Sequence, residues 1–304
     1  MSFARHGPIL VVIVSASLWG LFWLPLRAFE DMGLAAGWAT LAQFVTPALF
    51  LAPFALWRVL AGRSSGLGQV VSGLLIGSAF ALYAESLLLT EVARALILFY
   101  ITPVWATLLE LTVMGRHFTR ARAIALVMGL AGLFVILGGK TGVPLPQNLG
   151  DVMALASGML WAVGSLKVRQ AAETDLFAHI FAFFVYGGLF ALGLALLPIE
   201  VMGSPPAWSE LMALAPWLTL AAVGFLIPVM WGILWGAQHL DPGRLGILLQ
   251  LEAIVGITSA AVLTDEPFGL VEGLGTALVI GAGLADVLGD RRGDIRGVSR
   301  PDPP

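Results

Sequence analysis

The sequence predicts an all-α integral membrane protein with ten transmembrane helices, arranged as two inverted repeats of five helices each. Three observations predict this fold class: a strongly apolar composition, ten apolar stretches of membrane-spanning length, and a hydrophobic pattern that occurs twice. Of the 304 residues, 59% are hydrophobic and 12% are charged, and the mean hydropathy is +0.92. Soluble domains carry about 25% charged residues, so a lipid bilayer is the expected surrounding of this chain.

Each predicted helix is an apolar stretch of roughly 20 residues, the length that crosses the hydrocarbon core. The stretches are residues 7–28, 34–60, 67–89, 92–114, 121–139, 150–169, 176–197, 213–237, 243–264 and 268–289. The short connections hold most of the Pro, Ser and charged residues, so we expect no separate soluble domain. Arg5 and His6 before the first stretch are typical of a signal peptide, but the apolar run continues to Leu26, which is too long for one.

The hydrophobic pattern of the first half returns in the second half. At an offset of 142, the residues Ser15, Leu18, Trp19 and Arg27 are followed by Ser157, Leu160, Trp161 and Arg169. At an offset of 150, the residues Arg94, Gly115, Phe118 and Gly139 are followed by Arg244, Asp265, Phe268 and Gly289. We therefore predict two repeats, residues 1–147 and 148–304, the second ending in a short tail. Because five helices are an odd number, the second repeat enters the membrane inverted, as in many transporters.

The distribution of positive charge predicts the orientation. If the chain starts inside, 13 Lys and Arg residues fall on the inner side and only Arg27, Arg94 and Lys140 fall on the outer side. The positive-inside rule then places both termini in the cytoplasm. The expected location is the cell inner (cytoplasmic) membrane, with multiple crossings.

Several short motifs resemble those of the drug/metabolite transporter superfamily, and specifically its ten-helix EamA-type members. The motifs are Ser-Leu-Trp-Gly at 17–20, the stretch from Ala93 to Trp105, Gly138-Gly139, and Asp265-Glu266-Pro267. The likeness covers about residues 7–289, and it implies export or facilitated passage of amino acids, drugs or other small metabolites. The aromatic content is similar to that of the subgroup that exports aromatic amino acids.

Two positions depart from the pattern of that family. The resemblance implies related prolines in the fourth and ninth helices, but Pro103 is matched here by Ala253. The resemblance also implies an acidic residue after the fourth helix, where Gly115-Arg116-His117 stands instead. A symmetric pair of hinges is therefore not expected.

Glu252 is the leading candidate for function, because a carboxylate at membrane depth is costly and by default faces a cavity or a partner. It lies near the middle of the predicted helix 243–264, with Gln250 two positions earlier. Two interpretations stay open with equal weight: a substrate-amine or proton-coupling site, and a structural carboxylate hydrogen-bonded between helices. Glu85 and Glu110 lie nearer helix ends, where water and Arg94 or Arg116 are within reach, so a structural role is favoured for both.

Aromatic residues are the second group of candidates, since rings stack on aromatic substrates or hold cations. For any single ring, helix packing is the commoner role; the group as a whole favours a pocket. Gln43 and His179 are added as hydrogen-bonding candidates, with bridging between helices as an equal alternative. The predicted substrate-binding set is Trp19, Gln43, Tyr83, Tyr100, Trp161, His179, Trp231, Trp235, Gln250 and Glu252.

Prolines and glycines predict where helices bend and pack. Pro25, Pro47, Pro103 and Pro228 are expected to interrupt predicted helices, and Pro25, Pro103 and Pro228 are the leading hinge candidates. Three pairs of glycines have the small-xxx-small spacing of closely packed helices within one monomer: Gly73 with Gly77, Gly232 with Gly236, and Gly269 with Gly273.

The sequence argues against an enzyme, because the four His residues are scattered and no cysteine or P-loop pattern is present. A channel would need a filter run or a ring of like subunits. We expect a secondary transporter that uses alternating access, has no cofactor or metal, and binds no nucleic acid. Its partners are a small-molecule substrate and the bilayer, and a monomer is expected. Aromatic or amphipathic amino acids are the first substrate class, and drugs or cationic compounds are the alternative.

Overall fold

The computed structural model describes residues 3–62, 67–112, 120–138, 146–170, 175–240, 242–266 and 268–297. Within these ranges every regular element is a helix. The first half contains α1 (Phe3–Gly20), α2 (Trp23–Asp31), α3 (Ala36–Leu60), α4 (Leu67–Leu89), α5 (Val92–Phe99), α6 (Thr102–Thr112) and α7 (Arg120–Gly138). The second half contains α8 (Leu149–Gln170), α9 (Leu176–Ala195), η1 (Glu200–Met202), α10 (Trp208–Ala221), η2 (Ala222–Leu226), α11 (Ile227–His239), α12 (Pro242–Leu263) and α13 (Leu270–Gly297).

The helices correspond to the ten predicted stretches, three of which are divided in the structure. Five helical segments are long and apolar enough to cross a membrane: Gly7–Asp31, Ala36–Leu60, Gln69–Leu89, Leu176–Ala195 and Trp208–Gly236. Shorter apolar helices cover Ala123–Gly132, Leu149–Ser165, Leu248–Leu263 and Leu270–Ala285. The prediction of an all-helical, multi-pass membrane protein is therefore confirmed, while the count of ten crossings stays a prediction.

Each of the three expected hinge prolines follows an interruption of the α-helix. Proline lacks an N–H and its ring clashes with the carbonyl four residues earlier, so the preceding turn must open. Pro25 follows the turn at residues 21–22 that separates α1 from α2. Pro103 follows the break between α5 and α6, and Pro228 follows the π-helical turn η2. These three prolines therefore lie at bends, whereas motion about the bends is still a prediction. The expectation for Pro47 is wrong, because α3 continues through it without interruption.

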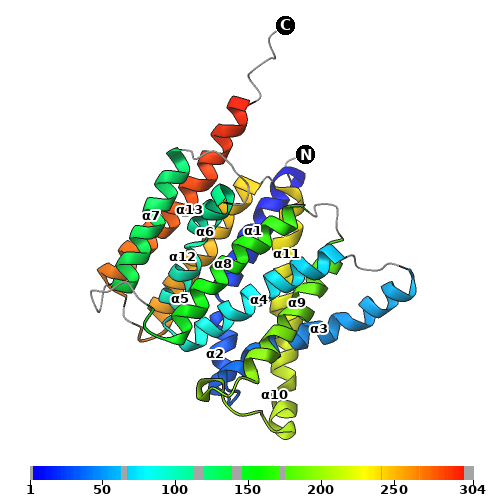
Figure 1. Ribbon diagram of the computed structural model, residues 1–304. Coiled ribbons are helices and arrows are strands. Elements are labelled where there is room, and N and C mark those ends of the chain that lie inside the picture. The colour runs from blue at the N-terminus through cyan, green and yellow to red at the C-terminus, as the bar shows by residue number, and fades with distance from the viewer. Residues whose placement is uncertain are drawn as a thin grey trace.

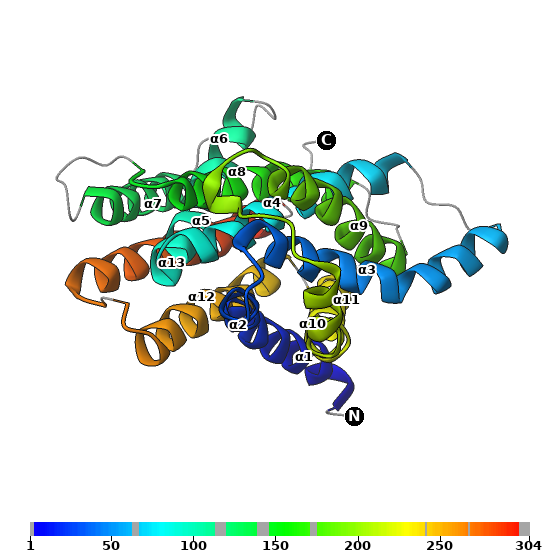
Figure 2. The ribbon, with the colours of Figure 1, turned by 90° about the horizontal axis from the view of Figure 1, so that it is seen from below.

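The helices form three groups (Figures 1 and 2). Helices α1, α4 and α8 lie in the middle, with α5, α7, α12 and α13 on one side and α3, α9, α10 and α11 on the other. The main apolar core lies where the middle group meets both sides. The start of α1 and the end of α13 lie at the same end of the bundle (Figure 1). This end is called the terminal end below, and the opposite end is called the loop end.

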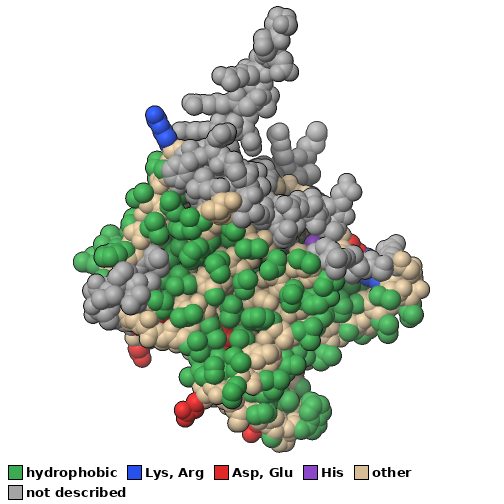
Figure 3. Space-filling view, in the orientation of Figure 1, with side chains coloured by type: hydrophobic (Ala, Val, Ile, Leu, Met, Phe, Trp, Pro, Cys, Tyr) green, Lys and Arg blue, Asp and Glu red, His purple; other side chains and the backbone are tan. Residues whose placement is uncertain are grey.

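The surface between the two ends is largely apolar. Hydrophobic side chains cover this face, and acidic side chains gather at the loop end (Figure 3). Large apolar side chains such as Leu49, Val127 and Trp217 are more than half exposed. An exposed apolar surface of this extent is unusual for a soluble monomer, and it suits contact with lipid.

Two of the three glycine pairs hold helices together. A Cβ on Gly77 would lie 2.5 Å from the backbone nitrogen of Gly187 in α9, and Gly232 and Gly236 of α11 face side chains of α1. The prediction for Gly269 and Gly273 is wrong. Nothing lies within 4 Å of a Cβ at Gly273, and Gly269 meets only the side chain of Glu272. In the described part of the chain the same spacing therefore occurs on a helix start where these two glycines make no close contact with another helix.

Candidate functional site

The candidate site is a buried carboxyl group held by two phenols. Tyr83 donates from its hydroxyl to Glu252 Oε1 at 2.9 Å, and Tyr100 donates to Glu252 Oε2 at 2.8 Å. Tyr100 also lies 3.1 Å from the carbonyl oxygen of Leu249. Glu252 is 6% exposed. Within the described ranges no Lys, Arg or His forms an ion pair with it, so this carboxyl group has donors but no countercharge.

Three separate parts of the chain build this site, and small residues bring them together. Tyr83 comes from α4, Tyr100 from the break between α5 and α6, and Glu252 from α12. A Cβ on Gly20 of α1 would lie 2.6 Å from the carbonyl oxygen of Glu252 and 3.0 Å from the nitrogen of Gly256. Only glycine allows α1 and α12 to approach this closely. Gly20, the last residue of the Ser-Leu-Trp-Gly motif, therefore fixes the depth of Glu252.

The break at Tyr100 is also stabilised locally. Because Pro103 has no N–H, the carbonyl of Phe99 lacks its usual helical donor. The Thr102 hydroxyl donates to that carbonyl at 2.7 Å. A Cβ on Gly158 of α8 would lie 2.6 Å from the same oxygen. The helix is thereby interrupted where the Tyr100 hydroxyl must reach Glu252.

An aromatic cluster centred on Phe80 adjoins the two phenols. Its ring centroid lies 5.3 Å from Trp19, 5.2 Å from Trp161 and 6.0 Å from Tyr83, each in an edge-on arrangement. The two repeat-related tryptophans therefore meet through one ring, which the sequence reasoning did not single out. Phe80 precedes Tyr83 by three residues on α4, and residues three apart share a helix face. That spacing is the signal that could have identified it.

Phe99 is the second aromatic residue that the sequence reasoning missed. Its ring centroid lies 4.8 Å from that of Tyr83 and 5.2 Å from that of Tyr100. It thus packs between the two phenols and limits their movement. Trp19 is only 2% exposed, and its indole N–H has no acceptor in the described part of the chain. A buried donor without an acceptor is costly.

The structure does not bring the other predicted site residues to Glu252. Trp231 is 44% exposed on the surface of α11, and Trp235 stacks on the ring of His239. The side chain of Gln250 meets Gly283 of α13, on a different face of α12. His179 lies in the first turn of α9, which packs mainly against α3 and α4. Gln43 is buried on α3.

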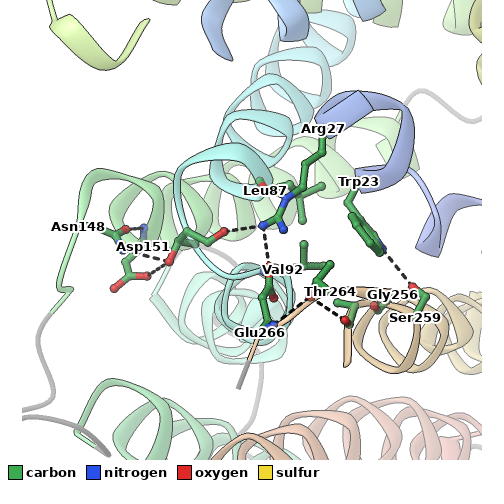
Figure 4. Close-up of polar contacts among 12 residues, drawn as sticks. Trp23, Arg27, Leu87, Val92, Asn148, Asp151, Gly256, Ser259, Thr264 and Glu266 are labelled. Atoms are coloured by element: carbon green, nitrogen blue, oxygen red, sulfur yellow. Dashed lines mark hydrogen bonds and ion pairs between the residues drawn. The ribbon is translucent and has the colours of Figure 1, made fainter. Parts of the chain in front are cut away.

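A network of charged groups ties the two halves together at the loop end (Figure 4). Arg94 donates to Asp151 through two bonds of 2.7 Å, from Nε to Oδ1 and from Nη2 to Oδ2. Asp151 also accepts from the Thr90 hydroxyl at 3.1 Å and from the backbone N–H of Gln147 at 2.8 Å. Each carboxyl oxygen of Asp151 therefore accepts two hydrogen bonds. This buried pair joins α5 to the start of α8.

A second pair at the same end links α2 to the segment after α12. Arg27 Nη2 lies 2.7 Å from Glu266 Oε1, and the backbone N–H of Val92 donates to Glu266 Oε2 at 2.8 Å. The guanidinium of Arg27 also donates to the carbonyls of Leu87 and Thr90. Glu266 belongs to the Asp265-Glu266-Pro267 motif, and its partner was not evident from the sequence.

The expectation that water and Arg94 reach Glu85 is wrong. Glu85 is fully buried, and Arg94 is engaged by Asp151 instead. The side chains of Glu110 and Pro103 lie outside the described residues. An apolar groove of about 330 Å³ runs between α3 and α9, lined by residues such as Leu49, Val185 and Leu189. It does not include Glu252, and its lining suits lipid.

Comparison with known proteins supports a transporter. Residues 6–138 match the model of the EamA-like transporter family. No curated protein matches the chain. Among 13 solved chains with similar structures, one crystal structure, described only as that of a protein, has 22% sequence identity and a TM-score of 0.57. That match covers 94% of this chain and 98% of the other, so it shows a shared fold over nearly the whole length.

The first half of this multi-pass membrane protein is thus similar to the EamA-like transporter family. The family match ends before α8. The residues of the Glu252 site come from both sides of that boundary.

Proposed function

We propose that this protein is a secondary transporter that moves small organic molecules across the membrane, with Glu252 as the anionic contact of its substrate site. The observation that carries the proposal is the buried Glu252 carboxyl group, held by Tyr83 and Tyr100 and paired with no cation among the described residues. The phenols stabilise a negative charge there, and an ammonium group supplies what the site lacks. The EamA-like domain supports transport as the class of function.

Aromatic or amphipathic amino acids are the substrate class that we propose first. The amine would contact Glu252, and the side chain would replace ring contacts in the cluster around Phe80. The unpartnered Trp19 indole N–H supports a polar ligand, such as a carboxylate, on the same side. Drugs and other cationic compounds are the alternative, because they share the ammonium group and lack the carboxylate.

Alternating access is supported by the way contacts recur between the halves. α1 packs against α11 and α12, and α8, its counterpart in the predicted repeat, packs against α4, α5 and α6. α7 packs against α13 and α3 against α9, so counterpart helices also meet each other. Such an arrangement suits one half moving against the other.

The test is counterflow of radiolabelled phenylalanine in proteoliposomes. Glu252→Gln keeps the shape and removes the charge, so we expect transport to fall by at least about tenfold, the equivalent of about 1.4 kcal/mol. The matched control is Glu210→Gln, which removes an exposed carboxylate at the start of α10 and should transport normally. Normal counterflow by a folded Glu252→Gln protein would exclude Glu252 from the substrate path. Competition by a cationic drug but not by amino acids would favour the alternative.

We also propose that the protein lies in the inner (cytoplasmic) membrane, with both termini in the cytoplasm. The 13 to 3 distribution of Lys and Arg supports it. A reporter that works only in the cytoplasm should be active when fused after Arg300 and inactive when inserted near Gly142. The reverse pattern would mean that the protein is inserted in the opposite orientation. Activity at both positions would contradict the odd number of crossings, five, that the inverted repeat predicts between Gly142 and Arg300.

A further inference from the structure

Helix α4 carries a second buried carboxyl group, which the Glu252 site does not use. Glu85 is two residues after Tyr83, so the two side chains point about 200° apart around the helix. Tyr83 faces α12, whereas Glu85 lies beside Thr40 of α3. Both Glu85 and Thr40 are 0% exposed. Helix α4 therefore separates two buried carboxyl groups.

The polar atoms around Glu85 are unsatisfied. Neither carboxyl oxygen of Glu85 makes a hydrogen bond with any described residue, and the same holds for the Thr40 hydroxyl. Gln43, three residues after Thr40 on the same face of α3, is 2% exposed, and its side-chain nitrogen also lacks a partner. Buried polar groups are almost always paired. Polar atoms of Glu85, Thr40 and Gln43 on two facing helices, without well-formed partners among the described residues, point to a species that completes the set.

Among the residues that the structure describes, the charged groups around Glu85 supply no countercharge. Glu30 of α2 is close enough to interact with it and carries the same sign. Arg27 of α2 is engaged by Glu266, and Arg94 of α5 is engaged by Asp151 of α8. Helices α3 and α9 also pack against α4. Arg58 lies at the opposite end of α3 from Thr40 and pairs with Asp175. His179 lies in the first turn of α9.

We propose that Glu85 is a proton-binding site, and that Thr40 and Gln43 exchange hydrogen bonds with it as the proton enters and leaves. A carboxylate in an apolar interior needs a countercharge or a proton. A metal cation would need several oxygen ligands, and the described residues contain no group of three acidic, His or Cys side chains. A proton needs only the carboxyl group itself.

The two carboxyl groups thus have different environments and different roles. Glu252 accepts two well-formed hydrogen bonds from phenol hydroxyls, whereas Glu85 has the Thr40 hydroxyl beside it and no bond of that quality among the described residues. Paired acids in contrasting surroundings commonly divide their work in this way. Glu85 lies on α4, and Tyr83 of the same helix contacts Glu252. A shift of α4 on substrate binding would therefore change the surroundings of Glu85. Coupling of proton movement to transport, unlike the proton site itself, rests on the proposed function.

The proton site is tested by infrared spectroscopy of the detergent-purified protein. A protonated carboxylic acid has a carbonyl stretch distinct from that of a carboxylate, and it shifts in heavy water. We expect such a band in the wild-type protein, its loss in Glu85→Gln, and its retention in Glu30→Gln. If Glu85→Gln does not fold, Glu85→Asp keeps an acid in altered surroundings and should move the band. A band that is absent from the wild type, or unchanged in the Glu85 variants, overturns the proposal.

Coupling is tested in proteoliposomes with phenylalanine. Glu85→Gln should keep counterflow, which needs no net proton movement, and should lose accumulation driven by a pH gradient. Accumulation that persists in Glu85→Gln overturns the coupling role. If the wild type shows no counterflow, the proposed function fails for this substrate, and the infrared band still decides whether Glu85 holds a proton.

Discussion

Glu252 and Asp151 are both buried carboxyl groups, but their partners are of different kinds. Asp151 is 0% exposed and receives two charged bonds from Arg94, one bond from Thr90 and one from the backbone at Gln147. Glu252 receives only two bonds from neutral phenols. The first group is neutralised and saturated, so it holds two helices together. The second has no cationic partner among the described residues, so it could accept a cationic group from a ligand.

The largest effect should come from breaking the saturated pair. Arg94→Met leaves Asp151 buried without its countercharge, so we expect a loss of about 3–5 kcal/mol in the free energy of unfolding. Thermal unfolding in detergent measures it. The control is Arg58→Met, because Arg58 pairs with Asp175, whose side chain is 37% exposed, and exposed pairs contribute about 0–1 kcal/mol. Equal losses in the two variants would erase the distinction between a saturated buried pair and a surface pair.

The second effect concerns the donors of Glu252. Tyr83→Phe and Tyr100→Phe each remove one hydrogen bond to the carboxyl group, and bonds to a charged group contribute about 1.5–3 kcal/mol. Each variant should therefore bind phenylalanine roughly tenfold or more weakly, as measured by the concentration dependence of counterflow. Tyr186→Phe, the third tyrosine of the chain, is the control and should leave binding unchanged. Unchanged binding in both site variants would mean that the phenols hold helices together and do not prepare a charge.

The smallest effect should come from the aromatic cluster. Trp19→Ala and Trp161→Ala each remove a ring that contacts Phe80, and ring contacts contribute about 0.5–1.5 kcal/mol beyond burial. We expect about two- to tenfold weaker binding of phenylalanine, and a smaller loss for leucine in the same counterflow assay. Trp231→Ala, at an exposed position, should change neither. Equal losses for phenylalanine and leucine would assign the cluster to packing alone.

Local patterns in the sequence predicted much of the fold. The apolar stretches became helices because transfer into lipid and backbone hydrogen bonding act segment by segment. Pro25, Pro103 and Pro228 marked the interruptions because a missing N–H acts within one turn. The cost of a carboxylate at membrane depth singled out Glu252. The boundary of the repeats at residues 147–148 and the orientation of the chain stay predictions.

The tertiary structure alone decided which side chains meet. Tyr83 and Tyr100 reach Glu252 across separations of 169 and 152 residues, and Arg94 reaches Asp151 across 57. Glu85 was expected near water and is fully buried, while Gly269 and Gly273 have helical packing spacing but make no close contact with another described helix. Periodicity defines the faces of one helix, but the choice of neighbour depends on how all the helices pack at once. For this reason the sequence determined the helices, their bends and one candidate carboxyl group, and the packing determined that group's partners.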